Sequence, residues 1–147
     1  MSTLFRIARI ACLAGGLTTS LAAGPAMAGD LTVNVGPDKS NAAGVLVVAL
    51  FAAAGHWLKT EQAHALIRVE PGAAAREVVL RDLPPGRYAL LAFVDVNGNG
   101  TLDKDADGKP IEPHGFSGDN GGSGPPDFDD AVIEVGAEDS AASITLK

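Results

Sequence analysis

Short apolar runs separated by turn-forming residues are the feature that most limits the folds open to this chain. After residue 28, runs of five to nine residues rich in Val, Leu and Ile alternate with clusters of Gly, Pro, Asn and Asp. Residues 31–35 alternate apolar and polar side chains, which is typical of a half-buried strand, whereas residues 44–52 are almost continuously apolar, as in a central strand. No amphipathic helical pattern occurs in this part of the chain. The pattern therefore predicts a fold built from strands.

Seven such runs predict seven strands, at residues 31–35, 44–52, 65–70, 76–82, 87–95, 131–135 and 142–146. Between the fourth and the fifth, Pro84-Pro85-Gly86 predicts a tight turn, because Pro fixes φ and Gly permits the reversal. Residues 53–60 are expected to form a short irregular turn, with Trp57 and Phe51 in or near the core. Seven short strands at this spacing favour an all-β fold, a seven-stranded antiparallel β-sandwich of the immunoglobulin-like type.

The N-terminus has the three parts of a secretory signal peptide. Arg6 and Arg9 provide positive charge, residues 10–23 are apolar and uncharged, and Ala26-Met27-Ala28 is a small-x-small cleavage site. The apolar stretch is shorter than the roughly 20 residues that a membrane-spanning helix needs. We expect residues 1–28 to be removed, leaving a periplasmic or secreted protein with a single domain at residues 29–147 and no membrane segment.

Loss of residues 1–28 changes the cysteine content and the net charge of the mature chain. The mature chain keeps 119 of the 147 residues and has no cysteine, so no disulfide can stabilise it. Its formal charge falls from −7 to −9, because two of the eleven basic residues are lost with the segment and none of the eighteen acidic ones. This charge would repel nucleic acids and anionic lipids. A divalent cation is the partner that it favours.

One long segment, residues 96–130, has hardly any strand character and is filled with Gly, Asp, Asn and Pro. Loops of this length in a compact domain are usually functional or disordered. Residues 95–103, DVNGNGTLD, fit the first nine positions of a D-x-[DN]-x-[DN]-G calcium-binding loop. Alternate side chains would place oxygen atoms on one side of a turn that Gly100 allows to bend. The spacing predicts a Ca²⁺ site with ligands from Asp95, Asn97, Asn99 and Asp103 and from the backbone carbonyl of Thr101.

The loop departs from an EF-hand at its twelfth position, which is Ala106 instead of a bidentate Glu. One further ligand must therefore come from elsewhere, and the candidates are Glu112, Asp127, Asp129 and Asp130. An overlapping copy of the spacing at residues 103–108 would allow a second ion. The alternative to an ion site is an empty turn, since the Asn-Gly pairs at 97–98 and 99–100 are both good hairpin-turn dipeptides.

Catalytic patterns are weak. Residues 115–119, GFSGD, approach a nucleophile elbow, but the last position is Asp119 and no strand is expected before it. The histidines, His56, His64 and His114, include no i, i+4 pair, so no zinc-binding helix is indicated. One Trp and one Tyr offer little for a sugar-binding cleft, although the many aspartates leave a small hydrolase as an alternative. We expect a protein that is not an enzyme.

Residues 83–103, LPPGRYALLAFVDVNGNGTLD, resemble a bacterial family, the domain of unknown function 2141 (DUF2141). The resemblance continues through residues 108–117, GKPIEPHGFS, and 124–131, GPPDFDDA, so it spans essentially the whole mature chain. The LPPGxY element also looks like that of transthyretin-like and carboxypeptidase regulatory-like sandwiches. The resemblance implies an exported β-sandwich without a recognised enzymatic activity, and it implies no substrate.

The family's Gly-x-Pro-x-Glu pattern is present as residues 108–112, which makes Glu112 the first choice for the remaining ligand. The resemblance also implies that the loop after residue 95 and residues 112–117 form one unit. We therefore expect an exported, non-enzymatic binding or structural module whose acidic loop is ordered by Ca²⁺. The alternative is an adhesion or carbohydrate-recognition domain that uses the same loop to bind a glycan or a protein of the cell envelope.

Overall fold

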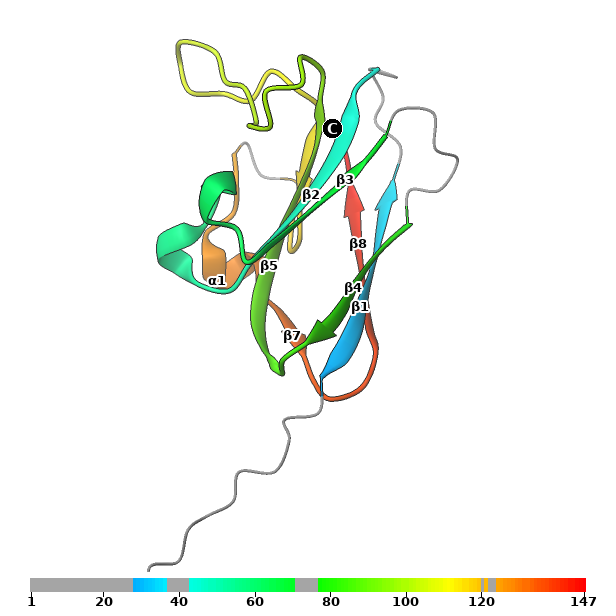
Figure 1. The fold of residues 1–147 in the computed structure, drawn as a ribbon. Helices are drawn as coiled ribbons and strands as arrows, with labels where there is room; N and C mark the ends of the chain where they lie inside the picture. Colours follow the sequence, from blue (N-terminus) through cyan, green and yellow to red (C-terminus); the bar gives the residue numbers. More distant parts are fainter. Residues whose placement is uncertain (1–27, 37–42, 71–76, 120, 122–123) are drawn as a thin grey trace, which may run out of the picture.

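The computed structural model describes residues 28–36, 43–70, 77–119, 121 and 124–147. Within them, eight strands follow in chain order (Figure 1): β1 (Gly29–Gly36), β2 (Val45–Phe51), β3 (Ala65–Val69), β4 (Glu77–Leu83), β5 (Gly86–Asp95), β6 (His114–Phe116), β7 (Ile133–Val135) and β8 (Ser140–Thr145). Two 3-10 turns, η1 (Ala54–His56) and η2 (Thr60–Gln62), lie between β2 and β3, and a short helix, α1 (Phe128–Ala131), precedes β7.

The strands form two sheets that pack as a β-sandwich (Figure 1). The smaller sheet has the order β4-β1-β8, and the larger has the order β3-β2-β5-β6, with β7 paired to the first residues of β5. β1 and β8 run parallel, with Leu31 opposite Ser140, and the other strand pairs are antiparallel. The ladder between β2 and β5 extends from Val45 opposite Asp95 to Phe51 opposite Ala89. β5 is therefore paired with β2 up to Asp95, where the acidic loop begins.

The main core lies between the two sheets. Alternate residues of β5, Tyr88, Leu90, Ala92 and Val94, face it, as the sequence alternation predicts. The β4–β5 turn is also confirmed, and the Tyr88 hydroxyl donates a hydrogen bond to the Pro84 carbonyl at 2.8 Å across it. Leu31, Val33 and Val35 of β1 fill the core from the opposite sheet.

A second apolar cluster covers the outer face of the larger sheet. Trp57 lies at its centre, with its ring centroid 5.3 Å from Phe51, 6.0 Å from Phe116 and 6.1 Å from Phe128, all in edge-to-face geometry. Its indole N–H donates to the Pro126 carbonyl at 2.9 Å. The predicted positions of Trp57 and Phe51 are confirmed. Because both faces of the larger sheet are covered at β2 and along most of β5, β2 is apolar throughout and β5 is apolar from Tyr88 to Val94, which explains the continuous apolar runs in the sequence.

All seven predicted strands are present, each within two residues of its expected bounds; Arg76, at the start of one, lies outside the described residues. The structure corrects two details of the predicted sandwich. An eighth strand, β6, lies inside the predicted 96–130 loop, and the β1–β8 pair is parallel instead of antiparallel. β6 has three residues, one of them Gly and none β-branched, so the sequence shows no apolar run from which this strand could be predicted.

The predicted signal peptide, residues 1–28, lies outside the described residues except for Ala28. Over the part of the chain that is described, no helix has both the length and the apolar character to cross a membrane.

The close approach of β6 to β8 makes a first prediction. A Cβ added at Gly115 would collide with the Thr145 carbonyl oxygen and the Ile144 side chain. Gly115→Ala should therefore lower the free energy of unfolding by about 1–3 kcal/mol, measured by urea denaturation. The matched control is Gly55→Ala, where a Cβ meets nothing within 4 Å, and it should change stability by less than about 0.5 kcal/mol. Equal midpoints for the two variants would contradict this packing.

The segment after β6 is joined to the last residue by an ion pair, with Lys147 Nζ 2.8 Å from Asp119 Oδ2. The hydrogen bond from Lys147 holds the pKa of Asp119 below its ordinary value of 3.8, against the opposing effect of burial. The stability that this pair adds is thus present above pH 3.8 and is lost as the pH falls through the lower folded-state pKa. Asp119→Asn should destabilise the protein at neutral pH and have little effect near pH 2, as followed by thermal unfolding at both pH values. An equal loss at both would refute the linkage.

Candidate functional site

The acidic loop leaves the sandwich at the end of β5 and returns at β6 (Figure 1). Asp95 is the last residue of β5, and its side chain is fully buried. A buried carboxylate needs hydrogen bonds or a counter-charge, because it has lost its hydration. The acidic loop provides the hydrogen bonds, and Arg68 on β3 provides the counter-charge.

Three backbone N–H groups of the loop donate to the Asp95 carboxylate. Oδ1 accepts from Gly98 at 2.7 Å and from Asn99 at 3.1 Å, and Oδ2 accepts from Gly100 at 2.8 Å. Gly98 and Gly100 have φ values of 77° and 81°, which a residue with a Cβ rarely adopts. These two glycines let the chain turn its N–H groups inward, so the predicted bend at Gly100 is confirmed.

Glu112 fixes the loop from the other side. Its side chain is buried, Oε1 accepts from the Val96 N–H at 2.8 Å, and Oε2 accepts from the Asp103 N–H at 3.1 Å. One carboxylate therefore binds the loop at two points seven residues apart in the sequence. The structure brings Glu112 to the Asp95 loop, as the family resemblance implies.

The exposed edge of the loop carries the remaining side chains of the predicted site. The Asn97 and Asn99 amides both donate to the Asp103 carboxylate, at 2.5 Å and 2.8 Å. Asn99 Oδ1 accepts from the Thr101 N–H at 2.9 Å and from its hydroxyl at 3.0 Å. Asn97, Asn99 and Asp103 thus converge on one point, whereas Asp95 and Glu112 bind the backbone behind it.

The side chains of the predicted ion site suit a hard cation. Every side chain in it offers oxygen, and a carboxylate has about four lone-pair positions, so Glu112 and Oδ2 of Asp95 keep acceptor capacity beyond the bonds described. The residues therefore fit Ca²⁺ by their chemistry. Among the residues described, no three His, Cys, Asp or Glu side chains form a metal-binding group on their own, so amide and carbonyl oxygens would have to contribute.

The other candidate ligands lie elsewhere. Asp127 precedes α1, and Asp129 and Asp130 lie on it, below the acidic loop in Figure 1. Asp129 binds the Arg87 guanidinium at 2.8 Å. In the overlapping copy of the motif, Asp105 Oδ1 accepts from the Asp107 and Lys109 N–H groups at 3.0 Å and 2.9 Å, which closes a small hairpin. Asp105 therefore closes a local turn, and Asp129 pairs with Arg87 at the surface of α1.

Arg68 is a member of the site that the sequence did not indicate. Its guanidinium lies 3.8 Å from Asp95 Oδ2, and a Cβ at Gly100 would come within 2.5 Å of its Nη2 atom. It comes from β3, 27 residues earlier in the chain, through the β3–β2–β5 ladder. No local motif could reveal it, because only the sheet brings the two residues together. Arg68 supplies positive charge beside the buried carboxylate.

Ser117, at the centre of the weak nucleophile pattern, has a structural role. It is buried, its hydroxyl donates to the Ala131 carbonyl at 2.6 Å, and its Oγ accepts from the Leu90 N–H at 2.8 Å. No histidine is among its hydrogen-bond partners in the described part of the chain. His114 instead places Nδ1 2.9 Å from the Glu112 carbonyl oxygen.

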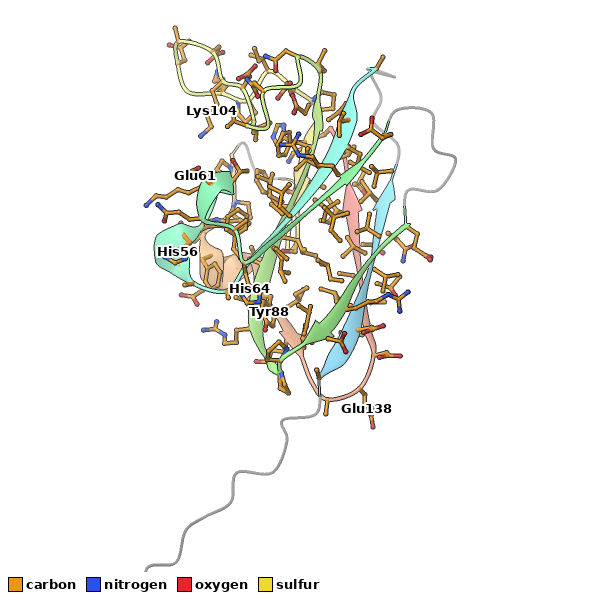
Figure 2. All side chains as sticks on the ribbon, in the orientation of Figure 1. His56, Glu61, His64, Tyr88, Lys104 and Glu138 are labelled. Carbon is orange, nitrogen blue, oxygen red and sulfur yellow. The ribbon has the colours of Figure 1, made fainter. Side chains whose placement is uncertain are left out.

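The two bonds to Glu112 lead to a second prediction. Glu112→Gln keeps the shape of the side chain but removes its charge and turns an N–H₂ group toward a backbone N–H. The free energy of unfolding should fall by about 1.5–3 kcal/mol, measured by urea denaturation. The control, Glu138→Gln, changes an exposed glutamate at the other end of the sandwich (Figure 2) and should cost less than about 0.5 kcal/mol. Equal losses would show that Glu112 does not hold the loop.

Comparison with known proteins finds one matching family. The model of the DUF2141 family, uncharacterised proteins conserved in bacteria, matches residues 37–143. No curated protein matches the chain significantly. Among solved structures, the pilus-presented adhesin Spy0125 (Cpa) aligns at 14% identity with a TM-score of 0.32, and a cysteine-to-alanine mutant of it at 12% and 0.32. Each alignment covers 82% of this chain and 27% of the adhesin. At that TM-score the likeness carries no conclusion about function.

Proposed function

The chain belongs to the DUF2141 family of uncharacterised bacterial proteins, and we propose that it is an exported, non-enzymatic module whose acidic loop binds one Ca²⁺. The observation that carries the proposal is the convergence of Asn97, Asn99 and Asp103 on one point at the edge of a loop that two buried carboxylates hold in place. The ion would take the place of the two amide N–H₂ groups at the Asp103 carboxylate, and Asn97 and Asn99 would turn toward it their Oδ1 atoms, which accept backbone N–H groups in this structure.

The remaining ligands would come from the same loop. The Thr101 carbonyl follows Asn99 and Gly100 in the turn, and Asp95 and Glu112 would each share one oxygen with the ion. Such a shell consists of carboxylate, amide and carbonyl oxygens, which Ca²⁺ accepts in a flexible arrangement. Mg²⁺ demands a more regular octahedron and gives up its water reluctantly, so it suits this loop less well.

The role of the ion would be structural. A cation bound to the folded state alone stabilises it by about 2.7 kcal/mol when its concentration is 100-fold above Kd. Extracellular calcium modules bind with Kd values of roughly 10⁻⁴–10⁻³ M, which suits an exported protein. The ion would add to the stability of a loop that already has backbone hydrogen bonds, and it would offset part of the protein's negative charge.

A calcium titration tests the proposal. Calcium in the millimolar range should give a saturable heat in isothermal calorimetry and raise the melting temperature, and a chelator should reverse both effects. Asp103→Asn keeps the shape of the side chain but removes the charge at the convergence point, so it should weaken calcium binding about ten-fold or more.

The matched control is Asp107→Asn in the neighbouring hairpin, which removes the same charge from an exposed residue that is not a ligand of the one proposed ion. It should bind calcium as the unaltered protein does. Absence of heat and of any melting shift in the unaltered protein would overturn the proposal. Equal weakening in the two variants would also do so, because it would indicate diffuse attraction to negative charge instead of a defined site.

A further inference from the structure

A small cavity lies between η2 and the acidic loop, beside the proposed ion site. Its volume is about 140 Å³, and its apolar lining includes Leu58, Leu91, Leu102 and Phe116. A dry cavity of about 150 Å³ lined by Leu, Ile and Phe is large enough to bind benzene. This cavity can therefore hold one aromatic ring or one branched aliphatic group.

The floor and one wall of the cavity are rigidly built. Leu91 and Phe116 belong to paired strands of the larger sheet and are 1% and 2% exposed. Leu58 has a φ of 64°, in the left-handed region that a residue with a bulky side chain rarely adopts. Such a conformation persists only where the surroundings impose it, and residues of this kind are concentrated at ligand sites. From there, the Leu58 side chain packs on the second apolar cluster and forms part of the cavity wall.

Two opposite charges line the same cavity. Glu61 lies on η2, and Lys104 lies on the loop above it (Figure 2). Within the described part of the chain, neither side chain takes part in a hydrogen bond or an ion pair. Both are exposed and long enough to adjust their positions. An apolar floor below one free carboxylate and one free ammonium group is complementary to a small zwitterion with an apolar side chain.

We propose that this cavity binds a free apolar α-amino acid of the size of leucine or phenylalanine. Its side chain lies on Leu91 and Phe116, its ammonium group binds the Glu61 carboxylate, and its carboxylate binds the Lys104 ammonium group. Glu61 and Lys104 are not ligands of the proposed ion site, so this binding goes beyond the calcium proposal and stands independently of it.

Titration of the purified protein with free L-leucine and L-phenylalanine tests the proposal by isothermal calorimetry and by ¹H–¹⁵N NMR. Saturable binding is expected, with shifts centred on the amides of Leu58, Glu61 and Leu102. N-acetyl-L-leucine amide has the same apolar group but neither charge, and it should bind at least about five-fold more weakly. Equal binding of the blocked compound, or no binding of either amino acid, would overturn the proposal.

Two charge-removing variants assign the contacts. Glu61→Gln and Lys104→Gln should each weaken L-leucine binding about five-fold, while Glu138→Gln and Lys109→Gln, which remove the same charges outside the cavity lining, should leave it unchanged. Unchanged binding in both Glu61→Gln and Lys104→Gln would refute the assignment. Each titration is made in calcium and in chelator; binding in either buffer supports the cavity, and its absence in both contradicts it, whatever the result for the ion.

Discussion

A carboxylate that is withdrawn from water must receive hydrogen bonds or a counter-charge, and this requirement determines how the acidic loop is built. Asp95 ends a strand that is buried on both faces, so its side chain cannot reach solvent. The loop meets the requirement by turning three backbone N–H groups toward Asp95, and two glycines with positive φ permit that turn. Glu112 likewise accepts hydrogen bonds from backbone N–H groups, those of Val96 and Asp103 at the two ends of the turn.

The consequence is that an acidic, glycine-rich segment becomes a defined extension of the sandwich. The Asp95 and Glu112 carboxylates hold the backbone of this segment on its inner side. Asn97, Asn99 and Asp103 lie together at its outer edge. Thr101, Leu102 and Lys104 of the same segment line the cavity over η2. Both proposed sites therefore depend on one interaction, the binding of backbone N–H groups by two buried carboxylates. The Trp57 cluster supports them from below, because it fixes Phe116 and the chain leading to α1 on the larger sheet.

The sequence predicted the features that depend on local patterns. Alternation and apolar runs located seven strands and the two-sided burial of β2, and the motif spacing located the bend at Gly100. Features that depend on long-range pairing were not accessible. β6 is too short to show a pattern, the parallel β1–β8 pair depends on which edges meet, and Arg68 reaches Asp95 only through the sheet. The motif spacing also could not show that Asp95 and Glu112 bind backbone N–H groups. Whether the loop binds an ion stays a prediction.

Amide hydrogen exchange, followed by NMR on the unaltered protein, tests the central role of the buried carboxylates most directly. The N–H groups of Val96 and Asp103 bind Glu112, and that of Gly100 binds Asp95, whereas those of Asn97 and Leu102 have no hydrogen bond within the described residues. Slow exchange at the first three positions and near-unprotected exchange at the other two is the expected result. Equally fast exchange at all five amides would contradict the account.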